Sequence, residues 1–376
     1  MKDHITIIGG GIGGLTTALT LKQKGFQVTV YESTTELKPV GAGIILANNA
    51  MQVMQKLGLQ EKLERAGNRI SALKITDPNL KLLSVVDLTC FEQKYRVSNL
   101  AIHRGDLQKI LAEEFGLENI IFSKRLAKLN KDTSCHLTFE DNTTLQASVI
   151  IGADGIKSVV RNQLFAENVI RKANQICWRG IGEIDLPPQY HHELNEAWGK
   201  GKRFGFVKIS DRKVYWYALA NTKPENIKRV DLSELFQDFH ADIGAIIKTT
   251  GQNEIVTSDI TDLLPIKKWQ IGNVCLMGDA AHATTPNLGQ GACQAIEDAY
   301  VLGKCLETET NVQTAFKNYE EIRRKKAHAV VNTSWQIGKL AHLENKYGVW
   351  FRNKLMQYMP QSANRKQLEM IFNLQY

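Results

Sequence analysis

The sequence lacks the long apolar segment that a membrane-spanning helix requires. No run of about 18 apolar residues occurs anywhere in the chain. A short polar start leads directly into the apolar residues Ile5–Ile8, whereas a secretory signal has a longer apolar segment and a small-residue cleavage site. We therefore expect a cytoplasmic protein with no integral membrane association.

Cysteine is sparse and shows no metal-binding pattern. None of the six cysteines forms a Cys-x-x-Cys pair, and no Cys/His cluster has the spacing of a zinc site. We therefore expect no metal centre and free, mostly buried thiols. The cysteines are Cys90, Cys135, Cys177, Cys275, Cys293 and Cys305.

Charge is in excess on the basic side, with a formal net charge of +8. The densest run, residues 323–326, lies within a helical pattern and has no interleaved aromatic residues, so a solvated helix face is favoured over a nucleic-acid patch. We expect no nucleic-acid partner. The positive balance equally suits an anionic cofactor and substrate.

The hydrophobic pattern predicts an α/β protein without repeats, low-complexity segments or an obvious linker. Ile5–Ile8 and Val28–Tyr31 read as buried strands on either side of a helix over residues 13–25. The pattern also predicts a hairpin over 135–151, a strand-rich stretch over 176–264 with one helical insert at 232–246, and a strand at 274–277 that returns to the first sheet. Further helices are expected over 48–57, 106–115 (capped by Asp106), 291–306 and 312–340, with a last amphipathic helix over 346–376 that closes the core and is not a membrane anchor.

A glycine motif follows the first predicted strand. The segment from Gly9 to Gly14 matches GxGxxG, with Gly9, Gly11 and Gly14 at the motif positions, and it opens a helix within a βαβ unit. Glycines there permit a tight turn, and the helix N-terminus attracts a pyrophosphate. Glu32 ends the second strand, where an acidic group accepts hydrogen bonds from a ribose. The motif predicts an ADP-containing dinucleotide.

Two further loops carry an acidic residue beside glycine. Asp154-Gly155 follows a predicted strand, and a plain helix cap is the alternative for Asp154. Gly278-Asp279 follows another strand and precedes a second glycine loop. We interpret His282 in that loop as structural, because no acidic or cysteine partner is placed to complete a triad.

These three motifs, in this order, resemble those of the group A flavoprotein monooxygenases, the family of para-hydroxybenzoate hydroxylase and salicylate hydroxylase. The resemblance extends from Ile5 to about residue 327. It implies a Rossmann-like FAD-binding domain interleaved with a smaller, sheet-rich substrate domain and followed by C-terminal helices. The implied boundaries are 1–70, 100–172 and 266–330 for the FAD-binding domain, 71–99 and 173–265 for the substrate domain, and 331–376 for the helices.

The resemblance also assigns cofactor roles. The first glycine motif would hold the ADP half of FAD, Gly278-Asp279 the ribityl and pyrophosphate, and Asp154-Gly155 both FAD and NAD(P)H. Arg104 would contact the flavin or its phosphates, and the Leu126 backbone would contact the adenine. The implied cofactor-binding residues are Gly9, Gly11, Gly13, Gly14, Glu32, Ser33, Ala42, Arg104, Leu126, Asp154, Gly278, Asp279, Gly289, Gln290 and Gly291.

Within this family the chain is most similar to the FAD-dependent urate hydroxylases, in the run Lys38-Pro39-Val40-Gly41-Ala42, in residues 282–291 and in the segments at 201–203 and 214–217. That likeness implies that Arg203 and Tyr215 touch the substrate and act in catalysis, and that Tyr217 and Pro286 line the site. Arg179 departs from the pattern, because the urate enzymes carry a substrate-binding asparagine there. Either Arg203 or Arg179 could clamp an anionic ring, since a guanidinium presents a rigid fork of donors.

The implied reaction is hydroxylation of a small, planar aromatic or heteroaromatic substrate, using NADH or NADPH and O2 through a C4a-hydroperoxyflavin. Two alternatives remain open. One is an oxygenase that acts on a polycyclic drug such as a tetracycline, or an alkene epoxidase. The other is a non-enzymatic flavoprotein, which the intact Asp154-Gly155 motif disfavours.

Overall fold

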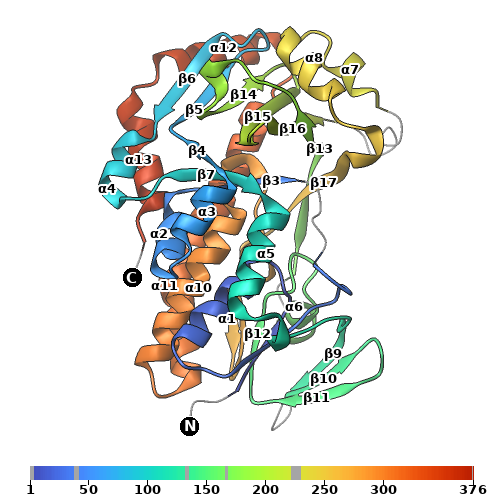
Figure 1. Ribbon diagram of the computed structural model, residues 1–376, viewed down its shortest axis with the longest axis vertical. Helices are drawn as coiled ribbons and strands as arrows, with labels where there is room; N and C mark the ends of the chain where they lie inside the picture. The colour runs from blue at the N-terminus through green and yellow to red at the C-terminus, as the bar shows by residue number, and fades with distance from the viewer. Residues whose placement is uncertain (1–3, 38–41, 132–134, 166–167, 222–229, 375) are drawn as a thin grey trace.

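Two sheets, stacked along the long axis of the molecule, organise the chain (Figure 1). The computed structural model describes residues 4–37, 42–131, 135–165, 168–221, 230–374 and 376, with the backbone alone at 361–364. The part of the urate-hydroxylase-like run at 38–41 lies outside the described residues.

The lower sheet is the nucleotide-binding type that the sequence predicts. Its strands are parallel except for the antiparallel edge pair β18–β19, and all four residues of β1 are buried. The predicted return of the chain at residue 274 is confirmed, because β19 pairs with β12. The strand order is β18 (Gln270–Ile271), β19 (Val274–Leu276), β12 (Val149–Gly152), β1 (Ile5–Ile8), β2 (Val28–Tyr31) and β8 (Ile120–Ile121).

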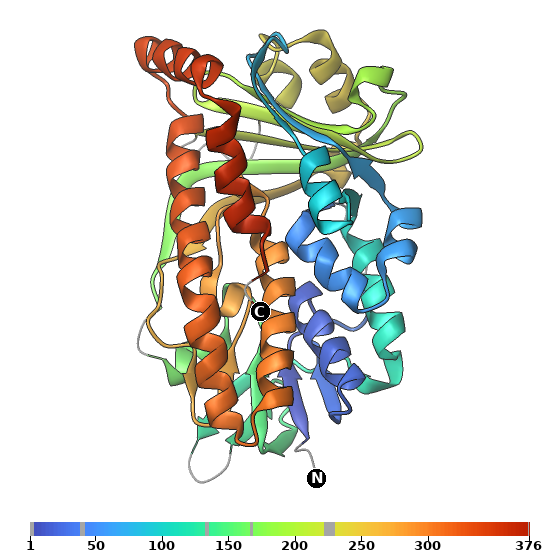
Figure 2. The same ribbon diagram turned by 90° about the vertical axis from the view of Figure 1, so that its left-hand side faces the viewer.

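Long helices flank this sheet, and α1 lies beside α10 (Figure 2). One predicted start is wrong: α5 begins at Arg104, because the His103 side chain caps it by accepting a hydrogen bond from the Gly105 N–H at 3.1 Å. Asp106 is therefore inside the helix and is not its cap. The helices are α1 (Ile12–Gln23), α2 (Asn48–Lys56), α3 (Gln60–Ala66), α4 (Thr89–Tyr95), α5 (Arg104–Phe115), α6 (Val159–Leu164), α9 (Asp279–His282), α10 (Gly291–Thr308) and α11 (Val312–Ala341).

The upper sheet has seven strands and two differently occupied faces. Because side chains alternate along a strand, Phe204 and Trp216 pack against helices α7 and α8, whereas Arg203, Tyr215 and Tyr217 face the opposite way. The expected helical insert is two helices, α7 (Leu232–Leu235) and α8 (Ala241–Lys248). The strand order is β17 (Val256–Leu263), β13 (Ile170–Glu183), β16 (Lys213–Asn221), β15 (Lys202–Ser210), β14 (Glu193–Trp198), β5 (Ala72–Thr76) and β6 (Leu82–Asp87).

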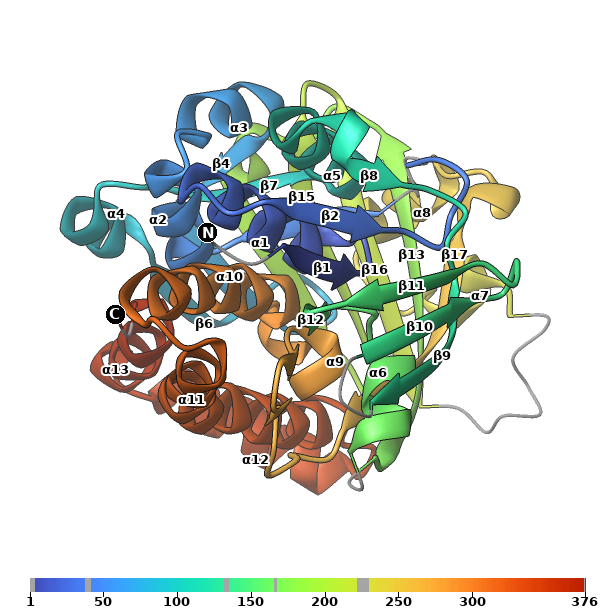
Figure 3. The ribbon, with the colours of Figure 1, turned by 90° about the horizontal axis from the view of Figure 1, so that it is seen from below.

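Two small sheets complete the core. The predicted hairpin over 135–151 is present in a three-stranded sheet that lies to one side of β1 and β2, away from α10 and α11, when the molecule is viewed from below (Figure 3). Its strands are β9 (Leu126–Lys131), β10 (Cys135–Phe139) and β11 (Thr144–Ala147). The other small sheet joins β3 (Gly43–Leu46), β7 (Asn99–His103) and β4 (Asn68–Ile70). The short 3-10 helices are η1 (Leu117–Asn119), η2 (Pro188–Tyr190), η4 (Gln252–Glu254) and η5 (Pro286–Leu288).

The C-terminal segment forms two helices where one was expected, α12 (Lys346–Tyr358) and α13 (Gln361–Phe372). Pro360 lies between them, and the residue before a proline is disfavoured in helical conformation. The predicted α/β architecture with C-terminal helices is confirmed, whereas the exact domain boundaries stay a prediction. Five of the six cysteines are buried, and all six are free. Within the described residues, no helix has the length and apolar character needed to span a bilayer.

Candidate functional site

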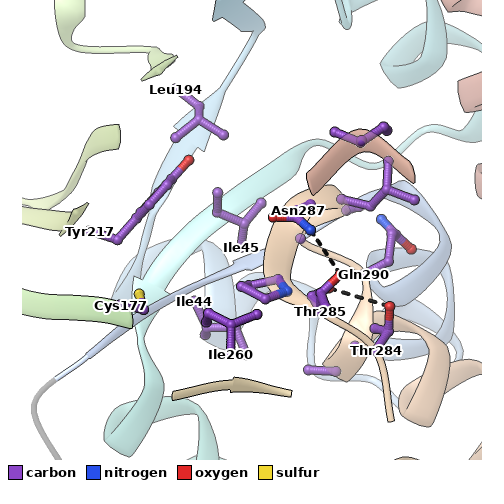
Figure 4. A pocket seen from close by; sticks show the side chains of 18 of the residues that line it. Ile44, Ile45, Cys177, Leu194, Tyr217, Ile260, Thr284, Thr285, Asn287 and Gln290 are labelled. Carbon is purple, nitrogen blue, oxygen red and sulfur yellow. Dashed lines mark hydrogen bonds between the residues drawn. The ribbon is translucent and has the colours of Figure 1, made fainter. Parts of the chain in front are cut away.

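A cavity of about 910 Å³ lies between the glycine loops of the lower sheet and the inner face of the upper sheet. In Figure 4, Tyr217 and Leu194 face the loop that carries Thr284, Thr285 and Asn287 across this space. All five predicted substrate residues line the cavity, and so do ten of the fifteen predicted cofactor residues. The five that do not are Gly9, Glu32, Ser33, Leu126 and Asp154.

The first glycine turn has the shape that a pyrophosphate requires. Gly9 has φ +110°, and a Cβ there would lie 2.4 Å from the Ala153 carbonyl oxygen, so no other residue fits. Gly11 has open space where a Cβ would be, and it lies at the N-terminus of α1. This open turn, with its unpaired helix N–H groups, fits the phosphates of a dinucleotide.

Glu32 supports the same turn from the end of β2. One carboxylate oxygen accepts a hydrogen bond from the Gly10 N–H at 2.7 Å, and the other accepts one from the Thr34 N–H at 2.8 Å and one from the Ser33 hydroxyl at 3.1 Å. The carboxylate thus fixes the turn, at the strand end where the ribose of a dinucleotide binds in this fold.

The loop of the Gly278-Asp279 motif places a carboxylate in the cavity. Asp279 begins α9 and lines the cavity. The surrounding protein desolvates this carboxylate and raises its pKa above the usual range. Asp279 and the neighbouring Arg104 together offer an acceptor and a cation to a polar cofactor.

A buried ionic network holds this loop from behind, and it corrects one expectation. His282 does have an acidic partner: its Nε2 lies 2.5 Å from Asp298 on α10. Asp298 also accepts the Gly278 N–H at 2.9 Å and the Arg323 guanidinium at 2.8 Å. Burial opposes ionisation of Asp298, but the charges of His282 and Arg323 outweigh it and lower the pKa of Asp298 to about 2. No nucleophile completes a triad among these groups, so the structural role of His282 stands.

The same network corrects the interpretation of the basic run 323–326 as a solvated face for two of its four residues, whereas Lys325 is exposed as expected. Arg323 is fully buried, where it pairs with Asp298 and with Glu297, the latter at 2.6 Å. Lys326 is also buried and lies 2.7 Å from Glu297. Sequence reasoning missed these pairs because their acidic partners lie on the preceding helix, α10.

The N-cap of α6 is Ser158 and not Asp154, although the Asp154 carboxylate also accepts hydrogen bonds at the start of this helix and keeps one oxygen free. Its Oδ2 accepts hydrogen bonds from the N–H groups of Val159 and Val160 at 2.7 and 3.1 Å. Its Oδ1 is buried and has no partner among the described residues, and burial raises the pKa of the carboxyl. This oxygen can therefore accept a hydrogen bond from a ligand, and the contacts of Asp154 to FAD and NAD(P)H stay a prediction.

Arg203 does not present a free cation to the cavity. Its guanidinium is 1% exposed and donates to Glu196 at 2.9 Å and to Asn287. Glu196 also accepts hydrogen bonds from the Trp198 indole N–H at 2.6 Å and from the Tyr217 hydroxyl. Glu196 is a site residue that the sequence did not reveal, because two of its three partners, Arg203 and Tyr217, lie on other strands.

The positive charge of Arg179 is less compensated by nearby groups than that of Arg203, the other candidate arginine. It donates to the Ser258 hydroxyl at 2.9 Å, and within the described residues no carboxylate lies within ion-pair distance of it. Tyr215 lies beside Tyr217 on β16, with 5.8 Å between ring centroids, and burial raises the pKa of both hydroxyls.

The cavity continues beyond these polar groups into an apolar arm. We use this name for the part that lies between β5, β6 and β14 of the upper sheet and the helices α11, α12 and α13. Its mostly apolar walls suit a hydrophobic substituent, with Lys74, Ser84 and Gln367 as the polar residues among them. Its apolar lining residues are Leu73, Ile75, Val86, Leu194, Trp198, Ile337, Leu340, Met356, Met359, Leu368 and Phe372.

Known proteins are similar to this chain in both sequence and fold. A family model described as an FAD binding domain matches residues 2–334. The chain is 34% identical to the aurachin C monooxygenase/isomerase of Stigmatella aurantiaca, over 100% of this chain and 99% of that protein. It is 31% identical to the 2-heptyl-3-hydroxy-4(1H)-quinolone synthase of Pseudomonas aeruginosa, over 98% and 97%.

A solved structure has the same fold. The crystal structure of Klebsiella pneumoniae HpxO complexed with FAD and uric acid has a TM-score of 0.90 and 25% identity, covering 99% of this chain and 97% of that one. The glycine turn, the Asp279 carboxylate and the Arg104 cation described above fit FAD as the cofactor. With the family model spanning 2–334 and two relatives above 30% identity along the whole chain, this protein belongs to the FAD-dependent monooxygenases.

Proposed function

We propose that this flavoprotein hydroxylates a quinolone-like heteroaromatic ring that carries an apolar chain, using NADH or NADPH and O2. The observation that carries the proposal is the apolar arm, which continues from the loop at 284–291 to the C-terminal helices. The names of two relatives point the same way, since one makes a heptyl-substituted hydroxyquinolone and the other acts in aurachin C chemistry.

The residues that the sequence predicts to bind FAD are part of this proposal. The turn at 9–14, Glu32, Ser33 and the Leu126 backbone would hold the ADP half of FAD, whereas Asp279, Arg104, Ala42 and the Gly289–Gly291 loop would hold the flavin half. When bound, FAD supplies electron transfer from NAD(P)H and activation of O2. The protein positions the substrate and excludes water. We place the reaction in the cytoplasm, where NAD(P)H is available.

The roles of the two arginines follow from their partners. Arg179, which pairs with a hydroxyl, would donate to the ring oxygen of the substrate and stabilise negative charge on it. Arg203, held by Glu196 and Asn287, would act with Tyr217 as a fixed wall and not as an anion clamp. Tyr215 and Pro286 would form the remaining walls beside the ring.

Substrate-dependent oxidation of NADH or NADPH under air tests the proposal. We expect 2-heptyl-4-quinolone to stimulate oxidation and to gain one oxygen atom from 18O2, seen by mass spectrometry. Urate competes as a second candidate, since the chain superimposes on HpxO bound to uric acid. Stimulation by urate and none by the quinolone would overturn the proposal.

A variant that fills the apolar arm provides a matched control. Ile337 is half-buried on α11 and lines the arm. Ile337→Phe should weaken turnover of the heptyl quinolone, because overpacking displaces the chain, while unsubstituted 4-quinolone should be processed as before. FAD content should not change in this variant.

A further inference from the structure

Exposed apolar side chains are concentrated at the C-terminal end of the chain. Of the fifteen large hydrophobic residues that are exposed in the described structure, nine lie after residue 339, and these nine include every exposed aromatic residue of the set. Scattered exposed apolar residues are normal on a protein surface, whereas a contiguous cluster marks an interaction site. The nine are Leu340, Tyr347, Trp350, Phe351, Leu355, Tyr358, Met359, Met370 and Tyr376.

Helix α12 has its aromatic residues on the outside. Tyr347, Trp350, Phe351 and Tyr358 are between 62% and 79% exposed, and their spacing of three, four and seven residues places them on one helix face. Figure 2 shows α12 at the end of the molecule opposite the N-terminus.

The inner face of α12 is already fixed to the protein. Arg352 is buried over the Trp198 ring at 5.3 Å and donates to the Ala341 carbonyl at 2.9 Å, and Met356 packs in the same cluster. The exposed aromatic face is therefore the outer side of a well-anchored helix. The sequence-based expectation that this segment only closes the core accounts for Arg352 and Met356 but leaves the outer face unexplained.

The charges around this face are mostly basic. Residues 344–369 contain five basic residues, of which Arg352 is buried, and two acidic residues, Glu344 and Glu369, at the two ends of the segment. Lys346 and Lys354 are exposed on α12 itself, and Lys339 is exposed at the end of α11. A helix with Trp, Tyr and Phe among lysines suits the boundary between water and an anionic bilayer, where aromatic rings lie at headgroup depth and lysines meet lipid phosphates.

This aromatic and basic face adjoins the apolar arm of the cavity. Leu340 and Met359 are solvent-accessible and line the arm, and Met356 lines the arm from the inner side of α12. The apolar arm therefore lies directly beside the aromatic face.

We infer that the outer face of α12, together with the adjoining end of α11, docks the enzyme on the surface of an anionic membrane, beside the apolar arm. A second copy of the chain is a poorer occupant, because a symmetric contact would bring the basic residues of both copies together. The docking does not depend on the identity of the substrate, so its test needs no turnover.

Co-sedimentation with lipid vesicles tests the inference. The holoenzyme should pellet with vesicles of equal parts phosphatidylglycerol and phosphatidylcholine and should bind less to phosphatidylcholine alone. Trp350→Glu/Phe351→Glu should lower the vesicle partition coefficient roughly ten-fold or more, because two apolar anchors become charged. Lys346→Glu/Lys354→Glu should remove the preference for the anionic vesicles.

The matched control changes exposed apolar residues elsewhere. Leu117→Glu/Val169→Glu also replaces two exposed apolar side chains by glutamate, but outside this face. This variant should bind vesicles like the parent. FAD absorbance and circular dichroism should be the same in all variants. Two results would overturn the inference: wild-type protein that stays in the supernatant with both vesicles, or a dimer that Trp350→Glu/Phe351→Glu dissociates, which would assign the face to a second copy.

Discussion

Removing the carboxylate of Glu196 leaves a cation buried beside the cavity. In Glu196→Gln, the Arg203 guanidinium loses the charge that lies 2.9 Å from it, although it keeps Asn287. The gross attraction across 2.9 Å is about 6 kcal/mol at an effective dielectric constant of 20. Desolvation offsets much of this, and losing one partner of a buried pair costs about 3–5 kcal/mol.

We expect the lower end, about 3 kcal/mol of unfolding free energy, because Glu196 borders the cavity and is 15% exposed. A double-mutant cycle with Arg203→Met isolates the pair. Urea unfolding of the parent, both single variants and the double variant should give a coupling of about 2 kcal/mol or more, with the double variant less destabilised than the sum.

Ligand binding adds a second readout. The parent should bind benzoate weakly, whereas Glu196→Gln leaves the Arg203 guanidinium without a negatively charged partner, and its attraction for an anion is about 1–4 kcal/mol. Benzoate should therefore bind the variant roughly ten-fold more tightly. Additive stabilities within about 0.5 kcal/mol, with benzoate affinity unchanged, would refute the view that Glu196 neutralises Arg203.

Three further predictions concern the cofactor, the pH response and the packing. Asp279→Ala should cost about 1.5–3 kcal/mol of FAD binding, a roughly 10- to 150-fold rise in Kd, seen by flavin fluorescence; an unchanged Kd with an unchanged circular dichroism spectrum would count against the assigned site. Burial, with the nearby charge of Arg203, lowers the pKa of His342 to about 3, below its unfolded value of 6.5, so its stabilising contribution is present above pH 6.5 and is lost as the pH falls. Between pH 7.5 and 5.5 the parent should lose about 1.4 kcal/mol more than His342→Asn, and equal losses in urea unfolding would contradict this. A Cβ at Gly205 would lie 2.1 Å from the Tyr217 ring, so Gly205→Ala should cost about 1–3 kcal/mol and much less in a Tyr217→Ala background, as melting temperatures would show.

Local sequence patterns were sufficient to predict those parts of the structure that one continuous segment of the chain forms. The turn at 9–14, the strand at 28–31 and the facing of Tyr215 and Tyr217 away from Trp216 all follow from periodicity and glycine positions. The loop residues that line the cavity could be predicted from their motifs, because each of these loops directly follows a strand that is recognisable in the sequence.

Pairings between distant segments could not be predicted in this way. Glu196 meets Arg203 because β14 and β15 are adjacent and antiparallel, with Asn195 opposite Phe206 in the register. Asp298 meets His282 and Arg323 because three helices converge behind one loop. Only the fold brings these charges together, so the acidic partners of His282 and Arg323 could not be predicted from the sequence.

The central claim, that the apolar arm receives the chain of a heteroaromatic substrate, is tested most directly by a series of 2-alkyl-4-quinolones of increasing chain length. Each buried CH2 contributes about 0.8 kcal/mol, so kcat/KM for substrate-dependent NADH or NADPH oxidation should rise roughly four-fold per carbon until the arm is filled. In Ile337→Phe, the increase in kcat/KM should end at a shorter alkyl chain than in the parent. Equal kcat/KM values for the unsubstituted and the heptyl quinolone, with FAD bound normally, would contradict the account.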